Sequence, residues 1–296
     1  MSFSSDVKTE LSRRLLDGAD CCTLSAVYGA LLYCSRCGKD GIKLTTENKA
    51  FADSLNALFP VLFRIKPDSA VQMRSGKYTI TISDPEKTRL IFDKFGYDPD
   101  HEPALHFNRA VLECEHCAEA FLRGAFLAGG SVTDPEKRYH LELLTGHYYV
   151  DREVYALMLE LNLRPKSAKR GGNNMLYLKA SSEIEDALTL IGAPISAMKV
   201  MTAKVEKGLR GGVSRLVNCD TANAEKTANA SVDQLIAIRK LQSSGKLSSL
   251  SDRLQEAAAL RLENPEISLA ELAKLSGVSK SGLAHRLKKI IEIASC

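Results

Sequence analysis

The most constraining feature of this sequence is an internal repeat. Residues 20–97 alternate helix-like and strand-like patterns, and residues 115–192 repeat that order. A single shift of 95 residues places Cys22 on Cys117 and Gly29 on Gly124. A repeat of this length predicts two similar α/β halves that pack on each other about a pseudo-twofold axis.

Each half is predicted to contain helices with alternating strands between them. In the first half we expect helices over 22–33, 50–63 and 85–95, and strands over 41–47, 61–66 and 78–83. In the second half we expect helices over 118–128, 151–161 and 181–191, and strands over 139–144 and 175–179. Ser181 or Ser182 is the expected cap of the last helix.

The rest of the chain departs from the repeat. The glycine-rich, basic stretch 207–214 (KGLRGGVS) predicts a flexible linker, residues 218–241 predict one long helix, and 243–251 predict a second linker. We therefore expect an α+β fold with three parts. These are a pseudo-twofold domain over 1–203, a basic linker and long helix over 204–251, and an all-α domain over 252–296.

A helix-turn-helix is predicted within this all-α part, from helices over 254–263, 269–275 and 280–291. Pro265 ends the first helix, because proline cannot continue the hydrogen-bond ladder. Ser268 and Glu271 have the spacing of a capping box. Gly277 supplies the tight turn, and Ser279 caps the last helix. This order of caps and turn is typical of a DNA-binding motif.

Charge is divided unevenly within the motif. Residues 252–271 hold five acids and two arginines, whereas residues 274–289 hold basic side chains and no acid. The last helix is therefore predicted to meet DNA phosphates and the major groove. The expected contact residues are Lys274, Ser279, Lys280, Ser281, His285, Arg286, Lys288 and Lys289. The alternative is a three-helix packing module with a solvated charged face.

The stretch Phe121–Val132 (FLRGAFLAGGSV) resembles the LAGLIDADG motif of homing endonucleases. In that family two such helices pack side by side through small residues, and an acid near the end of each holds a divalent metal at the scissile phosphate. Here Gly129 takes the place of one acid and Cys34 that of the other. Neither offers the hard oxygen ligand that Mg²⁺ requires.

The resemblance implies a LAGLIDADG-like domain whose helix pair persists while cleavage is lost. Gly29, Gly124 and Ala128 are then packing residues, because small side chains let two helix backbones approach closely. Asp40 and Asp134 lie nearby in the sequence. Such displaced acids are the route by which a residual metal-dependent endonuclease would act, and this is the competing hypothesis.

Three stretches, in order along the chain, resemble the WhiA family of cell-division and sporulation regulators. They are Arg123–Val132 with Tyr139–Glu142, Ser214–Asn223, and Ser279–Gly282 with His285–Leu287 and Lys289. Ser214 departs from the family pattern, which more usually has asparagine there. The resemblance implies a transcription factor, not an enzyme, that binds double-stranded DNA. It also implies roles in cell division, chromosome segregation and, in spore formers, sporulation.

Further partners are left open by this resemblance, and other transcription or division proteins are the candidates. A division scaffold that binds only proteins through its first domain is a third hypothesis. The net charge of +4 permits nucleic-acid binding without requiring it. Without a long apolar run or a signal-peptide core, we expect no membrane association and a cytoplasmic, nucleoid-associated protein.

The eight cysteines predict reduced thiols or metal ligands in such a compartment. Two pairs have the spacing of zinc ligands, Cys34 with Cys37 and Cys114 with Cys117, but the helix pattern places these pairs at opposite helix ends. The 95-residue shift instead aligns Cys21, Cys22, His116 and Cys117. This set is either a metal or redox site or a group of small buried side chains. No other cofactor is expected.

Overall fold

The computed structural model describes residues 2–16, 18–98, 100–101 and 104–295, and it divides into two compact units at residue 207. Residues 1 and 296, the outer bounds of the expected domains, lie outside the described residues. Within the described part of the chain, every helix is too short or too polar to cross a bilayer. Each unit has its own hydrophobic core.

Unit 1 confirms the predicted α+β repeat. After α1 (Phe3–Arg13), each half follows the order αββαββα. The first half contains α2 (Asp20–Leu32), β1 (Arg36–Gly38), β2 (Gly41–Thr46), α3 (Lys49–Phe63), β3 (Ser69–Gln72), β4 (Tyr78–Ile82) and α4 (Pro85–Lys94). A short 3-10 turn, Arg109–Val111, precedes the second half. The second half contains α5 (Cys117–Gly129), β5 (Gly130–Val132), β6 (Leu141–Thr145), α6 (Tyr148–Glu160), β7 (Lys166–Arg170), β8 (Asn173–Leu178) and α7 (Ser181–Ile191).

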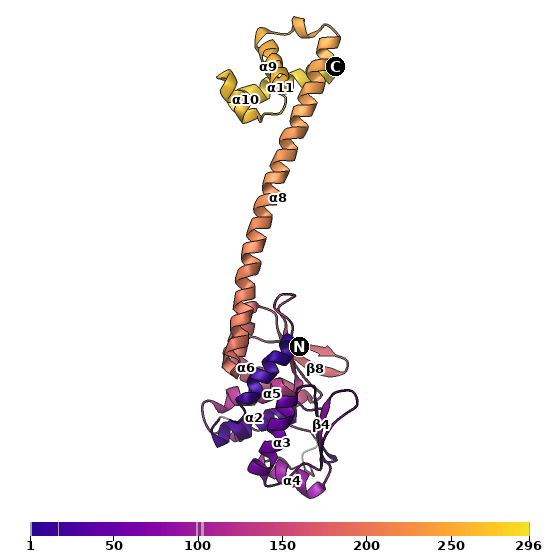
Figure 1. The fold of residues 1–296 in the computed structure, drawn as a ribbon, viewed down its shortest axis with the longest axis vertical. Coiled ribbons are helices and arrows are strands. Elements are labelled where there is room, and N and C mark those ends of the chain that lie inside the picture. Colours follow the sequence, from indigo (N-terminus) through magenta and orange to yellow (C-terminus); the bar gives the residue numbers. More distant parts are fainter. Residues whose placement is uncertain (1, 17, 99, 102–103, 296) are drawn as a thin grey trace. The chain divides into compact units, whose positions relative to one another are not determined.

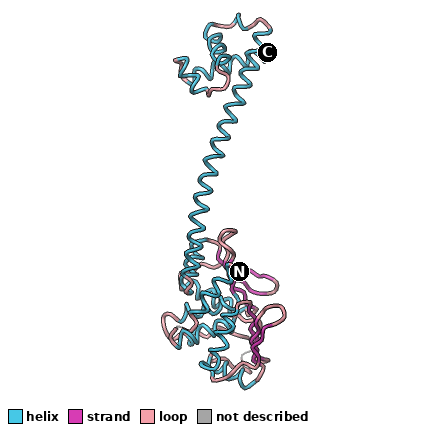
Figure 2. The backbone as a smooth tube through the Cα atoms, in the orientation of Figure 1, coloured by secondary structure: helices cyan, strands magenta, loops and turns pink. Residues whose placement is uncertain are grey.

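Each half forms one four-stranded antiparallel sheet, with strand orders β1-β2-β4-β3 and β5-β6-β8-β7. Figure 2 shows these strands in magenta beside the helices of unit 1. Leu44 pairs with Ile80 in the first sheet, and Leu143 pairs with Leu176 in the second. All four side chains are buried, because alternate residues of a strand face the same side of the sheet.

Helices α2 and α5 lie against each other in the middle of this unit (Figure 1). Nine of the thirteen residues of α2 are buried, including Ser25 and Tyr28, so this helix has no solvent-facing stripe. The helix pair is therefore the shared core element on which both halves pack.

Three local expectations for unit 1 were wrong. Residues 61–66 do not form a strand, because α3 continues to Phe63 and ends at Arg64 in the left-handed conformation. Pro60 stands in the last turn of that helix, where its missing N–H removes one hydrogen bond of the ladder without ending the helix. The short edge strands β1, β3 and β5 were missed, since three or four residues hold too little alternation. Neither serine caps α7, whose N-cap is Ala180.

The glycine-rich stretch 207–214 is helical and not a flexible linker. It lies inside α8 (Pro194–Ser243), which spans the boundary between the two units. Glycine lowers helix propensity by about 1 kcal/mol per residue but does not block the ladder as proline does. The helix continues through all three glycines of this stretch, and leucine and arginine, two good helix formers, stand between Gly208 and Gly211.

Unit 2 contains α8 from Gly208 onward, together with α9 (Asp252–Glu263), α10 (Leu269–Ser276) and α11 (Lys280–Ser295). A 3-10 turn, Leu247–Ser249, lies within the second expected linker. The core of this unit joins Ile238 and Leu241 of α8 to Leu272 of α10 and to Leu283 and Leu287 of α11. The predicted all-helical tail thus includes the end of the long helix as a packing partner.

Candidate nucleic-acid interface

The turn between α10 and α11 has the geometry that its residues predict. The Ser268 side chain accepts a hydrogen bond from the Glu271 amide, and the Glu271 carboxylate accepts one from the Ser268 amide, completing the capping box. Gly277 has φ 65°, the left-handed conformation that ends α10. The Ser279 hydroxyl accepts a hydrogen bond from the Gly282 amide at 3.2 Å, so Ser279 caps α11.

Arg261 supports the motif from inside, a role that the sequence analysis missed. Its side chain is buried at the end of α9, and its guanidinium donates to the carbonyl oxygens of Asn264 and Ile267. These two bonds hold the connection between α9 and α10. Burial lowers the pKa of Arg261, because a charged group loses solvation there.

Helix α11 is amphipathic, with one side in the core of unit 2 and the other exposed to solvent. Leu283, Leu287 and Ile290 face the core. Ser281, His285, Lys288 and Lys289 are exposed, as are Lys274, Ser279 and Lys280 beside the turn. Seven of the eight predicted contact residues are therefore exposed, and they lie on α11, in the turn before it and near the end of α10. A row of cations and hydroxyls on the exposed side of a helix suits contact with phosphates and base edges.

Arg286 differs from the other predicted contact residues. Its side chain is 23% exposed, and its guanidinium lies 3.8 Å from the Glu256 carboxylate of α9. At 100° per residue, position 286 falls beside the buried face of α11 rather than on the open one. Arg286 thus packs across the motif, and Lys289 is better placed to meet a phosphate.

In unit 1, the end of α5 lacks room for one of the two catalytic acids of homing endonucleases, and a cysteine stands at the other position. A Cβ atom on Gly129 would lie 2.5 Å from the Leu144 carbonyl oxygen and 2.9 Å from the Tyr33 ring. The Cys34 thiol donates to the carbonyl oxygen of Arg36 at 2.9 Å. Ala128 is half-buried against the core beside them. The backbone has closed over one of the two positions, so a carboxylate there would require the strands to move.

The predicted packing glycines lie at the closest approach of α2 and α5. A Cβ atom on Gly29 would lie 2.1 Å from the Phe121 carbonyl oxygen. On Gly124 it would lie 1.7 Å from the Ala26 carbonyl oxygen. The two contacts are related by the repeat, since Phe121 corresponds to Ala26. Only glycine fits at either position.

Glu142, in β6, is a buried acid whose role was not predicted from the sequence. Its carboxylate accepts hydrogen bonds from Ser131 at 2.9 Å, His140 at 3.0 Å and Arg170 at 2.7 Å. Burial by itself would raise the pKa of Glu142, but these hydrogen bonds and the charge of Arg170 lower it. Both oxygens are occupied within the sheet, so Glu142 is a structural anchor rather than a free metal ligand.

We predict that Glu142→Gln lowers the free energy of unfolding by about 2 kcal/mol at pH 7, because an amide cannot replace a carboxylate held by the charged guanidinium of Arg170. Since the folded pKa lies below the ordinary 4.5, this contribution is present above pH 4.5 and is lost as the pH falls through the lowered pKa. Urea denaturation at pH 7 and at acidic pH measures it. Glu113→Gln, at an exposed side chain, is the control. Equal stability of Glu142→Gln and wild type at pH 7 would contradict the anchor role.

The two acids considered as displaced ligands are engaged elsewhere. Asp40 lies 3.5 Å from Arg36 on the surface, and Asp134 accepts a hydrogen bond from the Glu136 amide in its own turn. Among the described residues, the cluster of ligand atoms suited to a metal ion contains thiols and no carboxylate.

That cluster consists of Cys21, Cys22, Cys114 and Cys117, hereafter the four-thiol cluster. Three of the four residues aligned by the repeat belong to it, but His116 does not. The His116 side chain is 68% exposed and turns toward Glu115 and Glu119. The 95-residue alignment of Cys21 with His116 does not hold in the structure, because α2 begins before Cys21 whereas α5 begins after His116. Cys114, in the loop before α5, takes the fourth place, and Cys34 and Cys37 lie outside the cluster, as expected.

The thiols of this cluster influence one another. Hydrogen bonding to Cys114 raises the pKa of Cys21. Burial and, to a smaller extent, hydrogen bonding to Cys114 raise the pKa of Cys22. Burial also opposes ionisation of Cys117, but interactions with Ser25 and Cys114 outweigh it and bring its pKa to about 7. One thiol of the cluster is therefore partly ionised at neutral pH.

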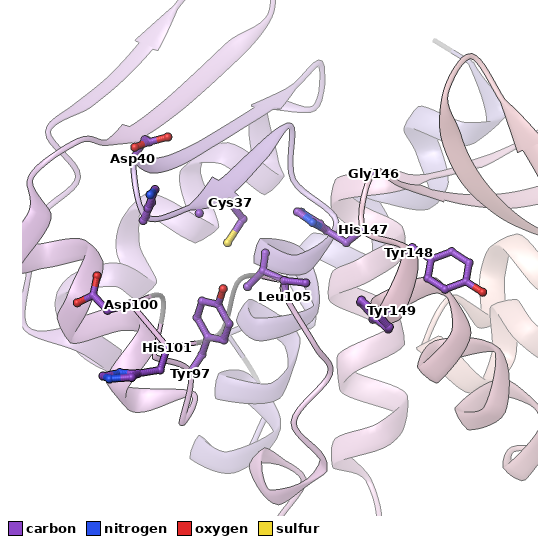
Figure 3. A pocket seen from close by; sticks show the side chains of 13 residues that line it. Cys37, Asp40, Tyr97, Asp100, His101, Leu105, Gly146, His147, Tyr148 and Tyr149 are labelled. Atoms are coloured by element: carbon purple, nitrogen blue, oxygen red, sulfur yellow. The ribbon is translucent and has the colours of Figure 1, made fainter.

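A cleft of about 790 Å³ lies between the β1–β2 turn and the start of α6. Figure 3 shows Cys37 and His147 pointing toward its middle, with Tyr148 turned away. Hydrogen bonding to Cys34 and burial raise the pKa of the Cys37 thiol, and burial lowers the pKa of His147. Both groups are then neutral at pH 7. A protonated thiol is a poor nucleophile, so we assign no chemistry to this cleft.

Comparisons with known families and proteins agree with both units. The WhiA LAGLIDADG-like domain model matches residues 118–210, and the WhiA C-terminal HTH domain model matches residues 213–294. "Probable cell division protein WhiA" from Ruminiclostridium cellulolyticum is 36% identical, over 99% of this chain and 97% of the relative. The protein of the same name from Clostridium botulinum is 34% identical, over 99% of this chain and 98% of the relative.

Among solved structures, full-length WhiA from Thermatoga maritima is similar over the whole chain. It is 26% identical, with a TM-score of 0.59, and the match covers 100% of this chain and 98% of that one. A solved relative thus matches both units of this chain along their whole length.

Proposed function

This chain belongs to the WhiA family, and on that premise we propose that it is a sequence-specific DNA-binding transcription regulator without nuclease activity. The observation that carries the proposal is the capped turn before α11 with basic and hydroxyl side chains exposed around it. A helix held in this way can enter the major groove while its lysines meet phosphates.

The loss of cleavage follows from the helix ends in unit 1. LAGLIDADG enzymes need one acid at the end of each helix, and this chain has Cys34 and Gly129 there. Mg²⁺ prefers carboxylate oxygens in an octahedral site. A thiol, and a glycine pressed against the Leu144 carbonyl, cannot supply such a site. The LAGLIDADG-like unit then serves as a scaffold or as a second DNA surface.

A specific observation favours a second DNA surface. The edge strand β7 carries Lys166 and Lys169 with exposed side chains, while Arg170 is tied to Glu142. An exposed basic edge attracts phosphates and discourages pairing with other strands. The proposed biological setting is cell division, chromosome segregation and, in spore formers, sporulation. Double-stranded DNA is the proposed principal partner, in a cytoplasmic, nucleoid-associated protein, with other transcription or division proteins as further partners.

Footprinting of the full chain on fragmented genomic DNA tests this function. We expect discrete protected sites, competed by specific DNA far better than by random DNA, and intact strands after incubation with Mg²⁺ or Mn²⁺. Metal-dependent cleavage at the protected sites would reverse the proposal in favour of a nuclease. Uniform protection of the DNA that weakens with salt, without discrete protected sites, would contradict sequence-specific binding. Binding of division proteins with no affinity for DNA would favour the scaffold hypothesis.

A further inference from the structure

We propose that the four-thiol cluster is a structural zinc site that joins the N-terminal ends of α2 and α5. Its Sγ–Sγ distances support this. Cys114 lies 3.6 Å from Cys21, 3.4 Å from Cys22 and 3.4 Å from Cys117, and the Cys22–Cys117 distance is 4.0 Å. Four sulfurs around Zn²⁺ at about 2.3 Å in a tetrahedron lie about 3.8 Å apart. The thiols already have the spacing of a tetrahedral site.

The chemistry of the donors selects the class of metal. Four thiolates are soft ligands, which favour Zn²⁺ over Mg²⁺ or Ca²⁺. Cys114 and Cys117 have the two-residue spacing typical of zinc sites, and the Cys117 amide donates to the Cys114 carbonyl at 3.1 Å to close that turn. Because all four ligands come from the protein, no position remains for a substrate or water. The site is therefore structural rather than catalytic.

Two helix N-termini lower the free-energy cost of bringing four negatively charged thiolates together. Cys21 and Cys22 lie in the first turn of α2, and Cys117 is the first residue of α5. Helix N-termini carry partial positive charge and stabilise thiolates. Zinc binds the thiolate form of cysteine, so zinc binding is expected to release protons and to weaken as the pH falls.

The position of the site would allow a bound metal to cross-link the two halves of unit 1. It connects the two halves of unit 1 through residues 92 to 95 positions apart in the chain. It lies at the N-terminal ends of α2 and α5, whereas Cys34 and Gly129 lie at their C-terminal ends. A metal cross-link between distant residues stabilises the fold by restricting the unfolded chain and by binding only the folded ligand set.

Metal content of the full chain tests the proposal. After purification with a phosphine reductant and without chelator, we expect about one zinc ion per chain by mass spectrometry. Cys114→Ser should lose most of this zinc, because Cys114 contacts the other three thiols. Cys219→Ser is the matched control, since Cys219 is an exposed cysteine of α8, and it should retain the metal. Equal zinc in both variants would place the metal elsewhere and overturn the assignment.

A second measurement does not depend on the variants folding. Co²⁺ added to metal-free wild-type protein should give the intense charge-transfer and d–d bands of tetrahedral cobalt thiolate, and Zn²⁺ should abolish them. Chelation should also lower the thermal midpoint of wild type but not of Cys114→Ser. Reduced wild-type protein with no zinc and no cobalt bands would refute the site. So would peptide mapping that finds the four cysteines paired as disulfides in protein handled under reductant.

Discussion

Gly124→Ala is expected to destabilise unit 1 by at least about 3 kcal/mol, because the new methyl group would lie 1.7 Å from the Ala26 carbonyl oxygen. That oxygen belongs to the backbone of α2, so no side-chain rotation can relieve the contact. The two helices would have to separate along their length, and the cores of both halves would open. Gly29→Ala meets the Phe121 carbonyl at 2.1 Å and should behave similarly.

Thermal unfolding measures this effect, with an expected decrease of roughly 6–12 °C for Gly124→Ala. Gly208→Ala and Gly212→Ala are matched controls, since both glycines are helical and a Cβ at either meets nothing within 4 Å. Because alanine has the higher helix propensity, these variants should be unchanged or up to about 1 kcal/mol more stable. Equal midpoints for Gly124→Ala and wild type would show that α2 and α5 do not approach as closely as described.

The elements that the sequence predicted well are those whose signals are local. Ser268, Glu271 and Gly277 act within one or two turns of their own helices, so their spacing alone identifies the caps and the turn. The repeat could be predicted for the same reason, because each half carries its own local pattern of helices and strands and the two patterns match. The predictions of a strand over 61–66 and of a linker over 207–214 were wrong because these segments lack such a decisive local signal. Their outcome depends on whether flanking residues continue a helix, and this depends on a balance of small propensities.

The parts of the site that escaped prediction depend on contacts between distant residues. Cys114 joins the four-thiol cluster because the loop before α5 folds back toward α2, and the shift of 95 residues cannot encode that loop. Glu142 acquires its role from Ser131 on the neighbouring strand β5 and from Arg170 on β7, which lies beyond β8 in the same sheet. The orientation of Arg286 was available in principle from a helical projection of α11, once Leu283 and Leu287 are assigned to the core.

The second large effect concerns α11, where we expect Lys280→Ala and Lys289→Ala to weaken DNA binding in different ways. Lys280 is the first residue of the helix, where recognition helices contact base edges. Its loss should reduce affinity for the specific site roughly 10- to 100-fold and leave random DNA nearly unaffected. Lys289, near the middle of the helix, is placed for a phosphate, and its loss should weaken both kinds of DNA alike.

Fluorescence anisotropy over a series of salt concentrations separates the two roles. Each phosphate contact contributes about 0.9 to the slope of log affinity against log salt, so Lys289→Ala should flatten that slope by about this amount. Lys246→Ala, at an exposed lysine outside α10 and α11, is the control and should bind like wild type. Because both target side chains are exposed, folding should be unaffected. If Lys280→Ala and Lys289→Ala bind as tightly as Lys246→Ala, then α11 is not the reading helix, and the DNA must be held by another surface.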